Sequence, residues 1–302
     1  MFNVLIVGYG SIGKRYHEAI LQTGLKVNII IKEKKKIKTI NSISKFKGKN
    51  LDLVIVSTNA DVRLKEVQKI IQRFNVKSWI LEKNLGQSFK QIDKLKYILN
   101  KNKKVWLTTN YKTMSCFKKL KKELFNKKNV IINIIGTDWG LCCNSMHFID
   151  TFKWIFSEKV KSISTKKLNK FWVNSKRKNF YEAYGTLNVK YETCEINLIS
   201  LKLKNNKYNN KIVYKIIGKK IISQYFHESG LYIKKKQKKY FGKIEPISQN
   251  MIKNIKNILI NKECELYSFN ECFEVHKLYL SSLYEHWKKY GKRNFKGVVP
   301  IA

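Results

Sequence analysis

The stretch VLIVGYGSIG, residues 4–13, decides the fold of the N-terminal part of this chain. Its first four residues are apolar and predict a buried strand, and the residues after it predict a helix that begins near Lys14. A Gly-x-Gly-x-x-Gly sequence between a strand and a helix is the fingerprint of a dinucleotide-binding turn. The alternative is a glycine-rich turn without a ligand, which the flanking strand and helix disfavour.

The three glycines have separate tasks in such a turn. Gly8 permits the sharp change of direction, Gly10 lets a pyrophosphate approach the backbone, and Gly13 lets the helix pack closely on the strand. N–H groups at the start of the helix, including those of Ser11 and Ile12, would point at the phosphates.

Short apolar runs then alternate with segments of helical period, which is the pattern of βαβ units. We expect strands at residues 3–7, 27–31, 53–56, 79–81 and 105–108, and helices at residues 14–23, 62–74 and 89–100. The sequence therefore predicts an α/β fold with an N-terminal Rossmann domain, a doubly wound parallel sheet, over residues 1–115.

The pattern changes after residue 150. Alternating β-rich runs extend to residue 244, including residues 194–203 and a hairpin with Gly218 and Lys219 in its turn. After Pro246 we expect a helix over residues 248–260. One face of a further helix carries Phe273, His276, Leu280, Leu283 and Trp287. The last five residues, 298–302, either pack back as a strand or stay mobile.

These patterns predict a second α/β domain over residues 116–302, with an open, mainly antiparallel sheet and C-terminal helices.

The composition restricts the class of protein. The 302 residues carry a net charge of +41, from 62 basic and 21 acidic residues. Only five of the basic residues are arginines, and the lysines are spread along the chain, which indicates a compositional bias rather than a nucleic-acid surface. No specific nucleic-acid partner is expected. A nucleic-acid binder stays an alternative that rests on charge alone.

No apolar stretch is long enough to span a membrane, and the N-terminus lacks the pattern of a signal peptide. We therefore expect a cytoplasmic protein. The six cysteines have no paired C-x-x-C spacing, which favours reduced thiols and gives no indication of a metal site.

Glu33 lies 20 positions after Gly13 (33 − 13), at the end of the second expected strand. A carboxylate there accepts hydrogen bonds from the 2′-OH of an adenosine ribose, as in NAD. The lysines around it, Lys32 and residues 34–36, are equally suited to the 2′-phosphate of NADP. A solvated charged turn is the third interpretation.

Polar residues also follow the next two strands. Ser57, Thr58 and Asn59 come after residues 53–56, where they would face the cofactor at the carboxyl ends of the strands. Glu82 and Lys83 follow residues 79–81. A lysine in that position can transfer protons, and its alternative is one more surface lysine.

Taken together, these motifs resemble the Gfo/Idh/MocA family of NAD(P)-dependent sugar and cyclitol oxidoreductases, over nearly the whole length. The resemblance rests on five stretches: residues 8–15, residues 52–59, Glu82-Lys83-Asn84 in place of Glu-Lys-Pro, residues 110–112, and residues 147–150 followed by Trp154.

The resemblance implies hydride transfer at a sugar carbon, with NAD or NADP as cofactor. It implies that Lys83 is the acid/base or hydroxyl-orienting residue and that His147 is its partner facing the substrate. Without the resemblance, His147 would be interpreted as a core residue. Glu82 joins the cofactor-binding residues. The expected substrate contacts are Arg15, Tyr111, Lys112, Trp139 and Asn144. The resemblance also implies that the second domain, residues 116–302, binds the substrate and forms oligomers, because members of the family commonly form homodimers or homotetramers through the second sheet.

Three departures put the chemistry in question. Cys143 stands where many members have an aspartate four residues before the histidine, Asn84 replaces the proline, and Arg63 replaces a common histidine. A non-catalytic dinucleotide-binding or sugar-sensing protein is therefore the alternative. Residues 139–145 resemble the variant in members associated with surface-glycan and nucleotide-sugar pathways, which suggests a sugar or an activated sugar as substrate.

Overall fold

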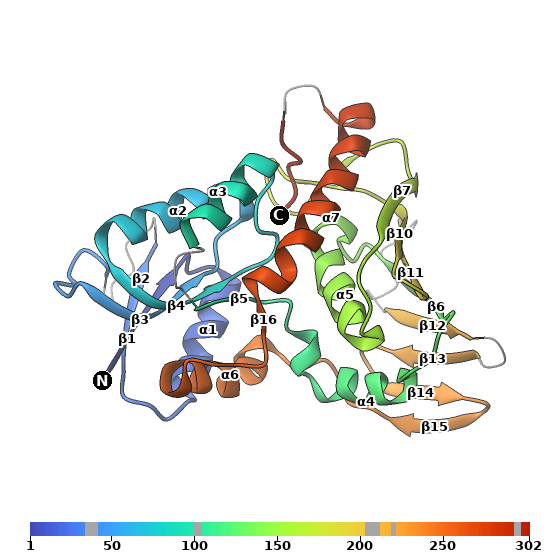
Figure 1. The fold of residues 1–302 in the computed structure, drawn as a ribbon, viewed down its shortest axis with the longest axis horizontal. Helices are drawn as coiled ribbons and strands as arrows, with labels where there is room; N and C mark the ends of the chain where they lie inside the picture. Colours follow the sequence, from blue (N-terminus) through green and yellow to red (C-terminus); the bar gives the residue numbers. More distant parts are fainter. Residues whose placement is uncertain (34–41, 100–103, 203–211, 219–221, 293–296) are drawn as a thin grey trace. The chain divides into compact units, whose positions relative to one another are not determined.

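The structure is a computed structural model that describes the chain except residues 34–41, 100–103, 203–211, 219–221 and 293–296 (Figure 1). The chain divides into two compact units. The first unit consists of Met1–Asn110 and Glu245–Phe273, and the second of Tyr111–Ile244 and Glu274–Ala302.

The first unit contains a sheet with the strand order β16-β5-β4-β3-β1-β2. The strands β1 to β5 are parallel, and β16 runs antiparallel to β5. The bounds are β1 Phe2–Val7, β2 Val27–Lys32, β3 Asn50–Val56, β4 Asn75–Leu81, β5 Lys104–Leu107 and β16 Tyr267–Ser268. The strand order reverses at β1, and the crevice at the carboxyl ends of strands beside such a reversal is where doubly wound sheets bind ligands.

The helices of this unit are α1 Ser11–Leu21, α2 Ala60–Arg73, α3 Phe89–Leu99 and α6 Ile247–Asn261. Helix α6 was expected in the second domain, but it belongs to the first unit. Its apolar face packs with α1 and the sheet around Tyr16, Ile20, Met251 and Ile255 in one buried core. An amphipathic helix buries its apolar face on whichever partner is nearest in space, which the order of the sequence does not reveal.

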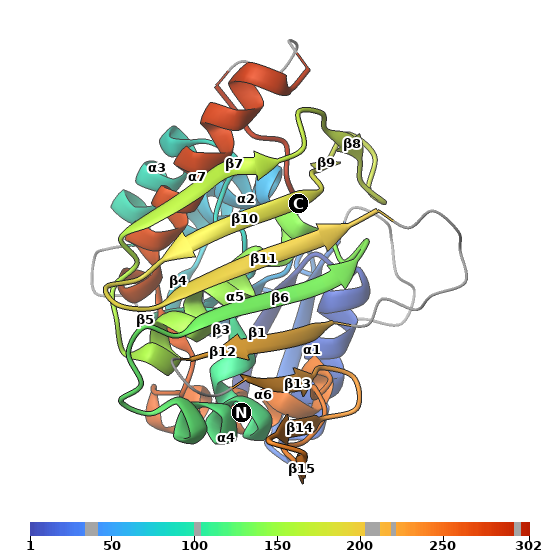
Figure 2. The same ribbon diagram turned by 90° about the vertical axis from the view of Figure 1, so that its right-hand side faces the viewer.

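The second unit contains a sheet with the order β15-β14-β13-β12-β6-β11-β10-β7, which Figure 2 shows face on. All neighbours pair antiparallel except β11 with β6. The bounds are β6 Ile131–Thr137, β7 Ser162–Leu168, β10 Gly185–Lys190, β11 Glu195–Leu201, β12 Val213–Ile217, β13 Ile222–Phe226, β14 Leu231–Lys234 and β15 Gln237–Tyr240. A separate pair joins β8 Val173–Asn174 to β9 Tyr181–Glu182.

One face of this large sheet is buried and the other is open. On β11, for example, Ile196 and Leu198 are buried, while Asn197 between them is only half-buried. The helices α4 Ser115–Leu124 and α5 Leu141–Phe156 lie behind the sheet in Figure 2. Helix α7, Phe269–Tyr290, runs through both units, and η1 is a short 3-10 helix at Asn110–Thr113.

The expected fold class is confirmed, and every expected helix and strand has a counterpart within a few residues. The strands β12 and β13 pair up to Ile217 and Ile222, so the predicted hairpin forms, although Lys219 of its turn lies outside the described residues. The C-terminal residues pack back without forming a strand. Val299 and Ile301 are fully buried, and the Pro300 carbonyl accepts a hydrogen bond from the Tyr181 N–H.

Within the described residues, no helix is both long enough and apolar enough to cross a membrane.

Candidate functional site

The glycine-rich turn joins β1 to α1 with the geometry that its sequence predicts. Gly8 has φ +88°, which favours glycine, and a Cβ on Gly13 would lie 2.1 Å from the Gly8 carbonyl oxygen. A Cβ on Gly10 would meet no atom within 4 Å, so the space in front of this residue is open. The turn therefore packs tightly at Gly13 and leaves room for a ligand at Gly10.

The loop after β3 is hydrogen-bonded to this turn. Ser57 Oγ donates to the carbonyl oxygen of Gly8 at 2.6 Å. Thr58 Oγ1 is buried and has no hydrogen-bond partner within the described part of the chain. Since a buried hydroxyl normally has a partner, Thr58 Oγ1 is a place where a bound ligand could supply one. Asn59 precedes α2 as its N-cap residue without a side-chain capping bond.

Glu33 lies beside the turn, as its spacing predicts. One of its carboxylate oxygens accepts a hydrogen bond from the Tyr9 N–H at 2.6 Å. Lys32 pairs instead with Glu66 on α2, at 2.6 Å. The lysines at 34–36 lie outside the described residues.

Glu82 and Lys83 follow β4. Glu82 is 8% exposed and accepts a hydrogen bond from the Tyr16 hydroxyl of α1 at 3.1 Å. Burial and the Glu82 carboxylate raise the pKa of Tyr16 well above its ordinary value. Glu82 therefore ties the end of β4 to α1. Lys83 beside it is half-buried, and the Lys83–Asn84 peptide bond is cis.

Arg63 of α2 joins the two loops that carry these residues. It is 1% exposed, and its guanidinium donates to the carbonyl oxygens of Thr58 and Asn84. The sequence singled out Arg63 only as a departure from the family pattern. In the structure it fixes the loop after β3 relative to the loop after β4.

In the second unit, His147 lies on α5 against Tyr111. The two rings stack with centroids 5.0 Å apart and planes at 18°. The Tyr111 ring also stacks with Phe117 of α4, with ring centroids 4.9 Å apart. His147 is half-buried, and its Nδ1 is among the buried side-chain atoms.

The start of α5 is held by Glu182 of β9. Its two carboxylate oxygens accept hydrogen bonds from the backbone N–H groups of Cys142 and Cys143, at 2.6 and 3.0 Å. Asn144 donates from its amide to the Trp139 carbonyl at 2.7 Å, and the Trp139 indole N–H donates to Ile199. Trp139 is buried, and Asn144 is half-buried.

Glu182 supplies the carboxylate that the first turn of α5 lacks, so its removal should destabilise the protein. We expect Glu182→Ala to lower the free energy of unfolding by about 1–2 kcal/mol. Glu192→Ala is the control, because Glu192 pairs with Lys161 at the surface at 3.9 Å and such pairs contribute little. Urea unfolding measures both variants, and equal losses would contradict the capping role.

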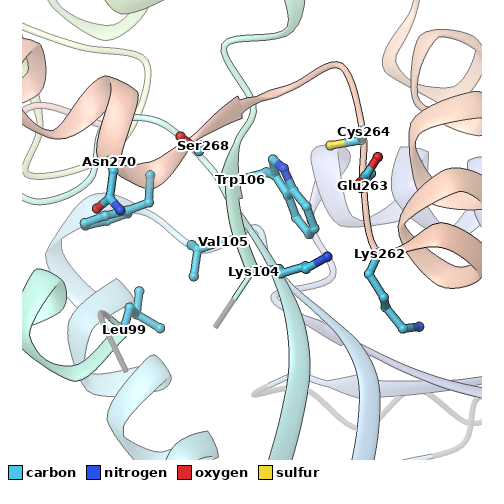
Figure 3. A pocket seen from close by; sticks show the side chains of 10 residues that line it. Leu99, Lys104, Val105, Trp106, Lys262, Glu263, Cys264, Ser268 and Asn270 are labelled. Carbon is cyan, nitrogen blue, oxygen red and sulfur yellow. The ribbon is translucent and has the colours of Figure 1, made fainter. Parts of the chain in front are cut away.

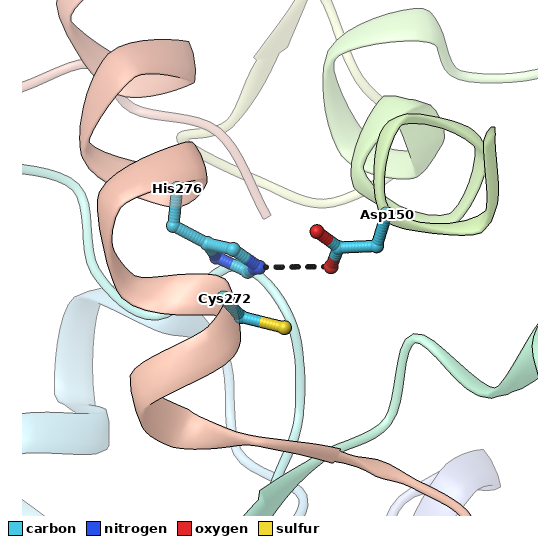
Figure 4. Close-up of side chains that lie close together, drawn as sticks. All are labelled: Asp150, Cys272 and His276. Carbon is cyan, nitrogen blue, oxygen red and sulfur yellow. Dashed lines mark ion pairs between the residues drawn. The ribbon is translucent and has the colours of Figure 1, made fainter. Parts of the chain in front are cut away.

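The last residue of the motif His147–Asp150 is buried in the core. Asp150 is 1% exposed, and its carboxylate lies 3.5 Å from Nε2 of His276 on α7 (Figure 4). Cys272 precedes His276 by one helical turn. The acid at the end of the motif therefore helps to fix α5 to α7 rather than facing solvent. None of the six cysteines, all of which lie within the described residues, forms a disulfide.

Arg15 and Lys112 differ in surroundings. Arg15 is exposed on α1, and Lys112 is half-buried in η1. Burial and the nearby charge of Lys112 lower the pKa of Lys121, which donates to the Trp154 carbonyl at 2.7 Å.

His227, which sequence reasoning missed, packs against the same tyrosine as His147. It follows β13, and its ring meets Tyr111 edge-on with centroids 5.8 Å apart. Its Nδ1 is 2.8 Å from the Tyr214 hydroxyl. No motif surrounds it in the sequence, and only the return of the chain through β13 brings it to Tyr111.

Burial lowers the pKa of His227 from 6.5 to about 4. Between these values the unfolded chain binds a proton that the folded protein does not, so the folded state loses stability as the pH falls from 6.5 to 4. We expect the loss between pH 7 and pH 4.5 to be about 1–3 kcal/mol smaller in His227→Phe than in the natural protein. Urea unfolding at both pH values measures the difference, and identical losses would contradict the assignment.

A cavity of about 390 Å³ lies elsewhere in the first unit (Figure 3). Lys104, Trp106, Lys262 and Cys264 are among its lining residues. Lys104 begins β5, so the cavity adjoins the amino end of that strand, opposite to the edge where doubly wound sheets bind ligands.

The sequence matches no family model and no curated protein. Solved structures match its fold. Biliverdin reductase from Synechocystis, solved with biliverdin and NADP⁺, is 13% identical with a TM-score of 0.70, and the match covers 96% of this chain and 99% of that one. UDP-N-acetylglucosamine 3-dehydrogenase GnnA from Acidithiobacillus ferrooxidans is 10% identical with a TM-score of 0.69, covering 93% and 96%.

A super-repressor mutant of Gal80p from Saccharomyces cerevisiae is 14% identical with a TM-score of 0.70, covering 95% and 96% of the two chains. At these identities the likeness shows the fold, which is that of the Gfo/Idh/MocA-type oxidoreductases. The fold implied by the sequence resemblance is therefore confirmed.

Proposed function

We propose that this chain is an NAD(P)-dependent oxidoreductase that transfers a hydride to or from a CH–OH/C=O carbon of a sugar or nucleotide-sugar derivative, in surface-glycan biosynthesis. The observation that carries the proposal is the turn Gly8–Gly13, which is closed at Gly13 and open at Gly10. The fold shared with dehydrogenases supports it.

The residues of the first unit fit a dinucleotide. The open space at Gly10 and the start of α1 suit a pyrophosphate, and the buried Thr58 Oγ1 needs a hydrogen-bond partner. The Glu33 carboxylate lies where it could accept hydrogen bonds from a ribose. We assign NAD(P) binding to this unit, and substrate binding and homodimer or homotetramer formation to the second.

The bound nicotinamide supplies or accepts the hydride. In the proposed mechanism, Lys83 Nζ exchanges a proton with the substrate oxygen, and Arg63 keeps the loop of Lys83 in place through the Asn84 carbonyl. His147 binds or orients the same substrate from α5. Cys143 does not replace the carboxylate common in the family, so Lys83 transfers the proton without that carboxylate, with His147 as its partner facing the substrate.

A non-catalytic role is the second candidate. It is favoured by Cys143 in place of an aspartate and by the likeness to a super-repressor of Gal80p, whose name denotes regulation. Both candidates predict NAD(P) binding, and only the first predicts turnover.

A turnover assay separates the two candidates. The purified protein is incubated with NAD⁺ or NADP⁺ and each of UDP-N-acetylglucosamine, UDP-glucose and myo-inositol, and in the reverse direction with oxidised sugar derivatives and NADH or NADPH. Absorbance of the reduced cofactor at 340 nm reports turnover. Cofactor-dependent turnover that Lys83→Met removes supports the enzyme. Cofactor binding without turnover of any substrate supports the regulator.

A further inference from the structure

We propose that His227 is a substrate-binding residue whose Nε2–H donates a hydrogen bond to a hydroxyl or carbonyl oxygen of the sugar. This inference rests on the proposed function, because it assigns a contact within the same substrate site.

The position of His227 supports the assignment. The Tyr111 ring carries His147 stacked on it at 5.0 Å and His227 edge-on at 5.8 Å. His227 therefore belongs to the same aromatic cluster as Tyr111 and His147. Since Tyr111 and His147 are expected to face the substrate, His227 is expected to lie near it as well. It reaches this cluster from the end of β13, whereas His147 comes from α5.

The hydrogen bond to Tyr214 fixes the proton on the other ring nitrogen. Burial raises the pKa of Tyr214 well above its ordinary value, so its hydroxyl keeps its proton at neutral pH. Burial also keeps the His227 imidazole neutral. A neutral imidazole has one N–H group. The Tyr214 hydroxyl is fully buried and lies 2.8 Å from Nδ1, with no other hydrogen-bond partner among the described residues, so we infer that the phenol donates to Nδ1 and that the imidazole carries its proton on Nε2.

The Nε2–H group is available to a ligand. It has no hydrogen-bond partner within the described residues, and it is not one of the buried polar atoms. The two ring nitrogens of His227 therefore differ: Nδ1 is held by a buried phenol, whereas Nε2 has no partner in the described part of the chain and is not completely buried. The lowered pKa suits a permanent donor rather than a proton carrier.

Two variants separate the donor from the ring. His227→Phe keeps an aromatic ring and removes the N–H, whereas His227→Gln keeps an N–H donor. With NADH present, the dissociation constants of UDP-N-acetylglucosamine, UDP-glucose and myo-inositol are measured by calorimetry. For the probe that the natural protein binds, we expect about a tenfold weakening in His227→Phe and less than about threefold in His227→Gln. Neither variant should change the dissociation constant of NADH.

Nuclear magnetic resonance of the ¹⁵N-labelled histidine rings tests the tautomer independently of any variant. We expect the proton of His227 on Nε2, and a shift of that signal on addition of the bound probe.

The inference is overturned if Nδ1 carries the proton or if His227→Phe binds the probe as tightly as the natural protein. If the protein binds NADH but none of the sugar probes, this inference and the proposal of a sugar substrate are overturned. The proposal that the chain binds NAD(P) is not affected by that result. Failure to bind NADH or NADPH overturns the proposed function itself.

Discussion

Replacing Lys83 with methionine should lower kcat by about 10²–10⁴-fold while the dissociation constant of NADH changes less than about threefold. Lys83 is half-buried directly after β4, at the carboxyl edge of the parallel sheet. Hydride transfer at an alcohol or ketone requires a proton to leave or reach the oxygen, and the lysine ammonium is the group proposed to move it. Methionine retains an unbranched side chain of similar length and removes the ammonium group, with its proton, charge and hydrogen-bond donors.

Lys77→Met is the matched control, because Lys77 lies on β4, the strand that precedes Lys83, and pairs with Asp52 at 2.8 Å. It should leave kcat within about twofold, since an exposed ion pair contributes little. Full turnover by Lys83→Met would remove Lys83 from the mechanism. Loss of NADH binding in that variant would instead assign the lysine to the cofactor site.

Replacing Gly13 with alanine should destabilise the first unit by about 2–4 kcal/mol and abolish NAD(P)H binding. The added methyl group would lie 2.1 Å from the Gly8 carbonyl oxygen, so the turn and α1 would have to separate. Urea unfolding and a fluorescence titration with NADH measure the two effects.

Gly10→Ala separates the effect on NADH binding from the effect on stability. Its methyl group would meet no atom within 4 Å, so the free energy of unfolding should change by less than about 1 kcal/mol. If a pyrophosphate approaches the backbone at Gly10, the same methyl group should weaken NADH binding at least about tenfold. Unchanged NADH affinity in Gly10→Ala would show that this turn does not hold the pyrophosphate.

The parallel half of the fold could be predicted because its strands are buried on both faces. Such strands appear in the sequence as continuous apolar runs, of which residues 4–7 and 53–56 are examples. The glycine spacing then located the turn, and the spacing to Glu33 placed a carboxylate beside it. The open sheet was also predictable, because β11 alternates buried and half-buried residues.

The contacts that organise the candidate site were not predictable, because they join residues far apart in the chain. Glu182 caps a helix that begins 41 positions earlier (182 − 141), and Arg63 holds the Asn84 carbonyl from another helix. His227 lies outside every motif. The preference of a residue for a helix or a strand carries no information about such tertiary contacts. The sequence therefore predicted the candidate site residues at the ends of strands better than the distant residues that hold them in position.

The most direct test of the central claim is a thermal-shift titration of the natural protein with NADH and NADPH at low and moderate salt, with a short DNA duplex as control. A ligand bound only by the folded state raises the free energy of unfolding by RT ln(1 + [L]/Kd). We predict a salt-tolerant rise in Tm with at least one of the two cofactors, and with DNA at most a rise that disappears as salt is added. No rise in Tm with either cofactor would contradict the assignment of this chain as an NAD(P)-dependent oxidoreductase.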